Sequence, residues 1–503
     1  MQSKLATWSA SDPCRRFDRM LRLIAQREWL AEAARITLSS KGAATAGVDG
    51  VHKVAFERNF DRHIDEVHEQ LLNGSYTPQP ARRVYIPKPN GKQRPLGIPT
   101  LRDRIVQRAM LMAMEPIWES DFHRLSYGFR PERSVHHAIR TVKLQLQDST
   151  ETVGRWVIEG DLSSYFDTVH HKKLMHCVRK RVRDQRFMAL LWRFLRAGHV
   201  DKGLFRAAEE GVPQGGVLSP LLSNIMLNEF DWWMDSRYVG KKARKDRWYW
   251  NNTIKRRRPI AVREGRMWIP AVAYCRYADD FVVVVKGTRR HAESIRKLLR
   301  VFLEDELSLT LNMEKTHITH VDDGFVFLGH RIIRKRGPRG NMRPVTTIPR
   351  EKLRAFARTI VNELSGDYSE NRIRMVERLN RRLAGWANFY QFTDYTAVIY
   401  SKLDRIVFWK LGYWLARKYK TSIKSLMRQF IRRPAPGAAK TWVIFGRSPN
   451  GVVCGITLRR LVTSKKLQFR WRNPETNPYI VRDEIRNTVT SRYRDVAMAM
   501  SHA

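Results

Sequence analysis

Residues 271–285 read AVAYCRYADDFVVVV, in which two adjacent aspartates, Asp279 and Asp280, stand between two apolar runs. The β-branched and aromatic residues on both sides are typical of strands, and residues 277–280 are few enough to form the turn of a hairpin. The sequence therefore predicts two paired strands that hold both carboxylates at the rim of a sheet. Carboxylate oxygens are ligands that Mg²⁺ prefers.

A third aspartate, Asp161, follows another apolar run, residues 155–160. This run is typical of a buried strand, so Asp161 is predicted at a strand end. An isolated Asp-Asp pair is usually a solvated turn, but the flanking strands and the third aspartate favour a metal site. Two divalent ions there can activate a 3′-hydroxyl and stabilise a leaving pyrophosphate. Without metal, mutual repulsion should raise at least one carboxyl pKa.

The charge of the chain indicates its class of partner. Its 503 residues have a formal net charge of +44, which suits a phosphate backbone, so we expect a nucleic-acid partner. Residues 331–503 carry 37 of the 93 Lys and Arg but only 11 of the 49 Asp and Glu, a net charge of +26. A chain of this length is expected to form two to four domains.

Other classes of protein are disfavoured by features that the sequence lacks. It has no run of about 18 uncharged apolar residues, and its first eight residues lack the apolar centre of a signal peptide. We therefore expect a soluble, cytoplasmic protein with no membrane partner. The cysteines, Cys14, Cys177, Cys275 and Cys454, stand singly, so neither disulfides nor a local zinc site are expected. Cys275 is predicted to be a small buried side chain.

Further sequence blocks occur in a fixed order along the chain. They are KGA at 41–43, GVDG at 47–50, YIPKPNGKQRPLGIP at 85–99, YGFRP at 127–131, GVPQGGVLSPLL at 211–222, YADD at 277–280, LNMEKT at 311–316 and FLG at 327–329. In this order the blocks resemble the reverse transcriptases encoded by bacterial group II introns. The resemblance extends over nearly the whole chain, and so many blocks in register do not arise by chance.

The resemblance implies a right-hand polymerase of the α+β class, with fingers and palm followed by a helical thumb. The expected domains are an N-terminal extension with the start of the fingers at 1–80, the reverse transcriptase fingers and palm at 81–330, a helical thumb or maturase (X) domain at 331–420, and a small basic nucleic-acid-binding region at 421–503. Apolar periodicity predicts helices at 15–36, 56–72, 352–364, 372–392 and 398–419, a loop at 42–50, and short strands at 442–445 and 451–456.

The resemblance also implies roles for single residues. Asp161, Asp279 and Asp280 are expected to be catalytic and to bind two Mg²⁺ ions. The residues expected at the incoming nucleotide are Lys88 and Arg94 on the triphosphate, Phe166 where a ribose 2′-hydroxyl would collide, and Gln214 and Ala278 along the pocket. Those expected at the primer or template are Tyr277, Gly215 and Lys315. Lys88 and Arg94 could instead be incidental charges of a surface hairpin, and Lys315 a surface charge.

The region after residue 350 suggests contact with RNA. Residues 378–390, RLNRRLAGWANFY, resemble the maturase signature, and Arg378, Arg381 and Arg382 are expected to bind RNA. The aromatic residues of this block could equally pack in a core. The basic and aromatic segment 232–266 suits a nucleic-acid groove or a solvated insertion. The short tail, without a cysteine after Cys454, leads us to expect no endonuclease.

These observations favour an RNA-directed DNA polymerase that also binds its own intron RNA, promotes its splicing and copies it into DNA during retrohoming. Its expected partners are the intron RNA, a DNA target or primer and deoxynucleoside triphosphates, in a ribonucleoprotein that associates with the nucleoid. Two alternatives stay open: a maturase that acts only in splicing, and a domesticated reverse transcriptase of phage defence or DNA repair. The intact acidic residues disfavour the first, and the maturase-like block disfavours the second.

Overall fold

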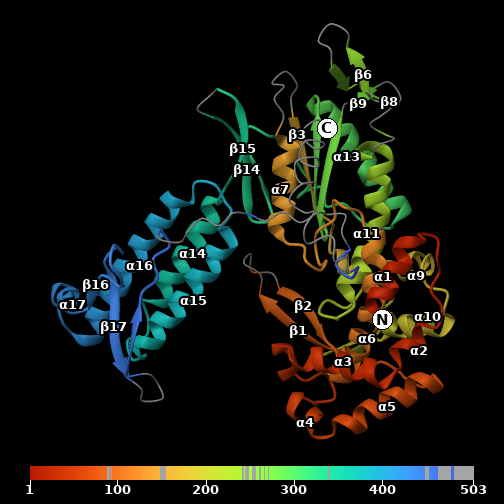
Figure 1. Cartoon of the computed structure of the whole chain (residues 1–503), viewed down its shortest axis with the longest axis horizontal. Coiled ribbons are helices and arrows are strands. Elements are labelled where there is room, and N and C mark those ends of the chain that lie inside the picture. The colour runs from red at the N-terminus through yellow and green to blue at the C-terminus, as the bar shows by residue number, and fades with distance from the viewer. Residues whose placement is uncertain are drawn as a thin grey trace. The chain divides into compact units, whose positions relative to one another are not determined.

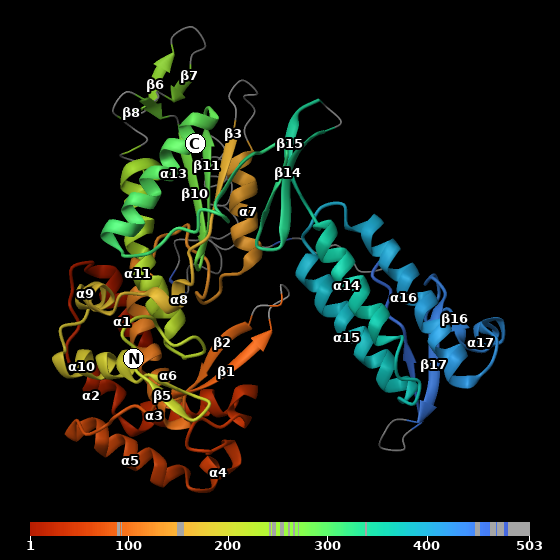
Figure 2. The same cartoon turned by 180° about the vertical axis from the view of Figure 1, so that it is seen from behind.

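The computed structural model describes residues 1–87, 91, 93–147, 155–240, 243, 248–251, 256–259, 262–264, 267–269, 271–337, 340–447, 453–462, 469 and 477–480. The chain divides into two compact units (Figures 1 and 2). Unit 1 contains residues 1–320 and the described residues 477–480, and unit 2 lies within Val321–Trp471. The division falls ten residues before the boundary predicted at residue 330, and each unit has its own hydrophobic core.

The N-terminal helices of unit 1 pack around one long helix, α6 (Leu101–Asp121). Pro116 lies inside α6 and has no N–H for the Met112 carbonyl, which instead accepts a hydrogen bond from Gln2 Nε2 at 3.0 Å. Gln2 of the first helix thus replaces the hydrogen bond that Pro116 removes from α6. The region predicted as one helix at 15–36 forms two. The elements are α1 (Gln2–Ser11), α2 (Met20–Ile24), α3 (Arg27–Leu38), the 3₁₀ turn η1 (Lys41–Ala44), α4 (Lys53–Arg58) and α5 (Phe60–Asn73).

A four-stranded sheet follows these helices in unit 1. Its strand order is β2-β1-β4-β5, with β1 (Ala81–Pro87), β2 (Gln93–Ile98), β4 (His199–Asp201) and β5 (Leu204–Arg206). The hairpin predicted around residue 90 is confirmed, because β1 and β2 are antiparallel with Pro87 opposite Gln93. β1 is parallel to β4, which the intervening helices of unit 1 make possible.

A second sheet of unit 1, with strand order β10-β11-β3-β12, contains the YADD residues. It consists of β3 (Arg155–Gly160), β10 (Val272–Tyr277), β11 (Asp280–Lys286) and β12 (His317–His320), and all its pairs are antiparallel. The strands predicted on each side of the aspartates are therefore present. Cys275 is fully buried, as predicted, and burial raises the pKa of its thiol.

Helices pack against this second sheet (Figure 1). α7 (Val135–Leu146) contacts β10, and α13 (Arg289–Val301) contacts β3 and β12. The apolar run Val282–Val285 is fully buried between such elements.

The other elements of unit 1 are α8 (Tyr165–Thr168), α9 (His171–Arg179), α10 (Gln185–Arg196), α11 (Ser219–Met234), the π-helical turns η2 (Asp235–Val239) and η3 (Phe302–Glu306), and the hairpins β6 (Trp248–Asn251) with β7 (Arg256–Pro259) and β8 (Val262–Glu264) with β9 (Met267–Ile269).

Unit 2 contains the helices and strands that the apolar pattern predicts after residue 350. The predicted helices are confirmed as α14 (Arg350–Glu363), α15 (Arg372–Tyr390) and α16 (Thr396–Tyr419), and the two predicted strands as β17 (Thr441–Arg447) and β18 (Val453–Thr457). The remaining elements are the sheet of β13 (Phe325–Phe327), β14 (His330–Arg336) and β15 (Met342–Thr347), with α17 (Ile423–Phe430) and β16 (Ile431–Arg432). No helix among the described residues is long and apolar enough to cross a membrane.

Candidate active site

Strand pairing in unit 1 brings the three predicted aspartates to one edge of the second sheet. Ala278 and Asp279 form a two-residue turn, because Tyr277 pairs with Asp280 across the hairpin. Gly160, the last residue of β3, pairs with Phe281, so Asp161 follows beside this turn. The register of the sheet therefore places side chains that are more than a hundred residues apart in the sequence within electrostatic range of each other.

The electrostatics of the aspartates confirm that they repel one another. Burial raises the pKa of Asp280 to about 6, with further increases from Asp279 and Asp161 and a partial decrease from Lys315. Burial also raises the pKa of Asp279, to which Asp161 adds, while Arg94 and Arg276 lower it. The expected increase of at least one carboxyl pKa is thus present, and its causes are desolvation and like charge.

The Lys315 ammonium partly balances this negative charge. Its Nζ atom donates to Asp161 Oδ2 at 2.8 Å. Across the described part of the chain, no three His, Cys, Asp or Glu side chains are grouped closely enough to hold a metal ion. The donors nevertheless fit Mg²⁺ in chemistry, because they are hard carboxylate oxygens whose mutual repulsion a divalent cation would relieve. Asp161, Asp279 and Asp280 are the residues that would hold it.

The YGFRP block of residues 127–131 packs against the turn and against β10. Tyr127 N donates to the Arg276 carbonyl, and Arg276 N donates to the Leu125 carbonyl, both at 2.9 Å. A Cβ atom at Gly128 would lie 2.3 Å from Ala278 N, so only glycine allows the two segments to approach so closely. Sequence reasoning missed Arg276, although a charged residue inside an apolar strand was a visible signal.

The loop 211–216 is hydrogen-bonded both to α8 and to β2, the strand that carries Arg94. Gly97 N on β2 donates to the Gln214 carbonyl at 2.7 Å, and Gln214 Nε2 donates to Asp167 Oδ2 at 2.9 Å. Gly215 has a φ of 104°, and a Cβ atom there would lie 2.6 Å from the Gly97 carbonyl oxygen. The structure therefore brings Gln214 and Gly215 next to the β1–β2 hairpin, whereas Lys88 lies outside the described residues.

Phe166 is held through both its backbone and its ring. Its carbonyl accepts from Val212 N at 2.7 Å, and its ring lies edge-on against Phe129, with centroids 6.3 Å apart. Phe129 is 51% exposed and has a φ of 57°, so a strained backbone presents an aromatic ring beside the predicted nucleotide pocket. Sequence reasoning did not single out Phe129.

The predicted RNA-binding arginines of α15 have different environments in unit 2. Arg378 forms ion pairs with Glu363 and Glu370, and Arg382 Nε lies 3.0 Å from Glu363 Oε2. Arg381 is exposed, and the described residues offer it no ion pair. Two of the three arginines therefore have acidic partners within the unit, which leaves Arg381 as the most available of the three charges.

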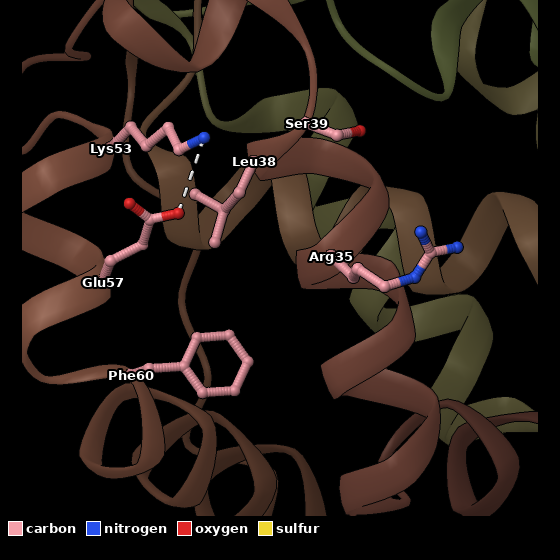
Figure 3. A pocket seen from close by; sticks show the side chains of 6 residues that line it. All are labelled: Arg35, Leu38, Ser39, Lys53, Glu57 and Phe60. Carbon is pink, nitrogen blue, oxygen red and sulfur yellow. Dashed lines mark ion pairs between the residues drawn. The ribbon is translucent and has the colours of Figure 1, made fainter.

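A separate hollow of about 320 Å³ lies among the N-terminal helices (Figure 3). It is lined by Arg35, Leu38, Ser39, Lys53, Glu57 and Phe60. Lys53 and Glu57, which both lie on α4, form an ion pair of 3.6 Å along one side of it. None of the predicted site residues contributes to this hollow, so it is not part of the acidic site.

Comparisons with known proteins agree with the fold. Residues 86–332 match the family described as reverse transcriptase (RNA-dependent DNA polymerase), and residues 353–431 match the maturase-specific domain of group II introns. The chain is 69% identical over 360 residues to Protein YkfC of Escherichia coli (strain K12), which covers 72% of this chain and 94% of that protein.

A second relative is the group II intron-encoded protein LtrA of Lactococcus lactis subsp. cremoris, which is 33% identical over 353 residues. The match covers 64% of this chain and 58% of LtrA. A putative COX1/OXI3 intron 2 protein of Saccharomyces cerevisiae is 29% identical over 338 residues, 62% of this chain and 39% of that protein.

The reverse transcriptase match and the fold together define an RNA-directed DNA polymerase of α+β architecture. The chain belongs to the group II intron-encoded reverse transcriptases, and it combines a reverse transcriptase domain with a maturase domain.

Proposed function

We propose that this reverse transcriptase binds its own intron RNA, promotes its splicing and copies it into DNA during retrohoming. The observation that carries the proposal is the convergence of Asp161 on the Asp279–Asp280 turn in a chain that also has a maturase domain. A maturase that acts only in splicing would not require these clustered carboxylates, because their mutual repulsion is costly to maintain. The proposed site of action is the bacterial cytoplasm, at the nucleoid when DNA is the target.

Different residues of unit 1 are assigned to the metal ions, to the triphosphate and to the primer and template. Two Mg²⁺ ions held by Asp161, Asp279 and Asp280 would supply activation of the primer 3′-hydroxyl and stabilisation of the leaving pyrophosphate. Arg94, together with Lys88, binds the triphosphate through charge-assisted hydrogen bonds. Tyr277, Gly215 and Lys315 are placed by this proposal at the primer and template.

Selection of the sugar is assigned to Phe166. Gln214 and Ala278 line the nucleotide pocket, and the Phe166 ring would collide with a ribose 2′-hydroxyl, so deoxynucleoside triphosphates are preferred. The edge-on contact with Phe129 limits the rotation of the Phe166 ring. A rigid ring discriminates better than a mobile one, because the collision cannot be avoided by a change of rotamer.

The intron RNA, a DNA target or primer and the polymerase are proposed to act in one ribonucleoprotein. The net charge of +44 supports binding to phosphate backbones. On α15 we assign RNA contact mainly to Arg381, with Arg378 and Arg382 contributing only insofar as their ion pairs to Glu363 and Glu370 allow.

Replacing one central carboxylate tests the polymerase and leaves the rest of the proposal measurable. We expect Asp279→Ala to abolish primer extension on an RNA template, because a metal-binding carboxylate is lost. Binding to the intron RNA should stay within about threefold of the parent, since the maturase domain is unchanged. Primer extension, filter binding and splicing of a precursor RNA are the three measurements.

The matched control is Asp305→Ala, which removes an exposed carboxylate of η3 outside the predicted site. It should leave all three measurements unchanged. Primer extension by Asp279→Ala at the rate of the control would contradict the site assignment. Loss of splicing together with extension, in a folded variant, would contradict the separation of the two activities.

A further inference from the structure

A fully buried arginine, Arg276, lies directly beneath the catalytic turn. Its guanidinium donates to both oxygens of Asp231, from Nε at 2.7 Å and from Nη2 at 2.5 Å. It also donates from Nη2 to Ser126 Oγ at 2.8 Å, and from Nη1 to Asn224 Oδ1 at 3.0 Å. The remaining contact is to the turn itself, from Nη1 to the Ala278 carbonyl oxygen at 2.8 Å.

The partners of Arg276 are in turn fixed by other groups. Tyr274 donates its hydroxyl to Asp231 Oδ1 at 2.7 Å, and Asn224 Nδ2 donates to the Gly128 carbonyl at 2.8 Å. Asp231 and Asn224 are fully buried on α11, whereas Gly128 belongs to the YGFRP block. Two separate chain segments, α11 and residues 126–128, are therefore joined through one guanidinium to the carbonyl that immediately precedes Asp279.

The Ala278 backbone needs such support. Its φ is 57°, in the left-handed region, which is unfavourable for an alanine because its Cβ atom crowds the following carbonyl oxygen. The plane of the peptide between Ala278 and Asp279 determines the direction in which the Asp279 side chain leaves the turn. A hydrogen bond to the carbonyl of this peptide therefore acts on the aspartate, although Arg276 itself is buried away from solvent.

The arrangement also ensures that the donor stays charged. Burial alone lowers the pKa of Arg276, but the ion pair and hydrogen bonds with Asp231 outweigh it, and the net shift is upward. The charged guanidinium of Arg276 donates to both carboxylate oxygens of Asp231, so it has little freedom to rotate. The remaining N–H bonds of its planar fork are consequently held in the direction of the turn.

We propose that the Arg276–Asp231 pair is a positioning device for the reaction, which holds the Ala278 carbonyl and thereby orients the Asp279 carboxylate toward the metal. This role rests on the proposed polymerase function. Arg276 touches no substrate in it, and acts only through the turn.

The test removes both charges together, because a single substitution would leave an unpaired buried charge. In the double variant Arg276→Met with Asp231→Asn, the asparagine still accepts a hydrogen bond from Tyr274, and the core stays neutral. A matched control exists in the same unit, where Arg181 Nε lies 3.0 Å from Asp121 Oδ2 in a second largely buried pair. The control is Arg181→Met with Asp121→Asn.

We expect the two double variants to show similar losses of thermal stability. Only the Arg276 variant should lose about 10- to 100-fold in kcat for primer extension, with an unchanged KM for primer–template. Binding of Mn²⁺ without nucleotide, followed by electron paramagnetic resonance, should weaken in this variant and not in the control. Arg276→Lys keeps the charge opposite Asp231 but has no planar fork, so it should show an intermediate kcat.

Equal kcat and Mn²⁺ affinity in the two double variants would overturn the positioning role. If the Arg276 double variant does not fold, Arg276→Lys decides, and a kcat equal to that of the parent overturns the proposal. A parent chain that extends no primer would contradict the proposed function itself. An active parent with an equally active Arg276 variant would contradict only the role of the buried pair.

Discussion

At the scale of a single residue, Asp280 shows that clustered carboxylates reduce the stability of the metal-free fold. Its pKa of about 6 lies well above the ordinary value of 3.8, because partial desolvation at the sheet edge and the like charges of Asp279 and Asp161 disfavour the ionised form. Between these two pH values the unfolded chain loses the proton while the folded chain retains it. Stability therefore decreases as the pH rises from about 4 through about 6.

Removing this charge should stabilise the metal-free protein. At pH 7 we expect Asp280→Asn to raise the free energy of unfolding by about 0.5–1 kcal/mol, because the asparagine cannot ionise, while solvent screens part of the repulsion at this exposed residue. The gain should vanish below about pH 4, where Asp280 is protonated in both states. Denaturant titrations in EDTA at both pH values measure it, with Asp305→Asn as the exposed control. A gain that is equal at both pH values would refute the electrostatic cause.

At the scale of elements, the turn that contains Ala278 and Asp279 depends on close packing between the β10–β11 hairpin and the YGFRP block. The decisive contact is that of Gly128 with the Ala278 backbone. Neither segment can move away easily, because the Tyr127 and Arg276 backbones are hydrogen-bonded to each other. A change in one element is consequently transmitted to the carboxylates of the other.

Adding a single methyl group tests this dependence. We expect Gly128→Ala to destabilise unit 1 by about 1–3 kcal/mol and to reduce primer extension at least tenfold, because its Cβ atom would displace the turn. Gly42→Ala is the control in the same unit, since its Cβ atom would meet only Ser40 Oγ at 3.8 Å. Thermal melts and primer extension measure the effects. A Gly128→Ala variant as active as the control would show that the turn tolerates displacement.

On α15, substitutions of neighbouring arginines should have different effects, because Arg378 forms ion pairs and Arg381 is exposed. We expect Arg381→Gln to weaken RNA binding at low salt and to reduce the slope of log K against log salt concentration by about 0.7–0.9, as one phosphate contact is lost. Arg378→Gln should instead lower the melting temperature, because Glu363 and Glu370 lose their partner. Binding titrations over several salt concentrations and thermal melts distinguish the two. The reverse pattern would assign the RNA contact to Arg378.

At the scale of the whole molecule, two hydrophobic cores define two folding units. The core of unit 2 extends from Ile348 to Leu461 and includes the fully buried Trp414 and Trp442. Trp442 Nε1 donates to the Phe408 carbonyl at 2.9 Å, so the C-terminal strands are tied to α16. The region after residue 420 thus shares its core with the helices that precede it.

This shared core predicts independent folding of residues 321–471. We expect this fragment to melt cooperatively, and a fragment that ends at residue 420 to be much less stable, since it lacks Trp442. Circular dichroism and calorimetry of both fragments, with the whole chain for comparison, are the measurements. An unfolded 321–471 fragment would mean that the two cores are not separate folding units.

Local sequence determined a large part of this protein. The apolar runs around Asp279 and Asp280 specify strands, the helical period of unit 2 specifies α14 to α16, and both are properties of neighbouring residues. The ordered blocks also identified the class of enzyme. The N-terminal helices were less well predicted. The interruption between α2 and α3, at Ala25 and Gln26, lies inside one continuous apolar pattern, so the pattern does not reveal it.

Only the tertiary structure decided which of these side chains meet. The register of β3 against β11 brings Asp161 to the turn, and Asp231, 45 residues before Arg276, becomes its buried partner only when α11 packs under the sheet. Likewise, Arg378 is paired with Glu363 and Glu370 because α15 folds back beside α14. Periodicity is set by the backbone over a few residues, whereas partners distant in the sequence are selected by packing, which no local pattern contains.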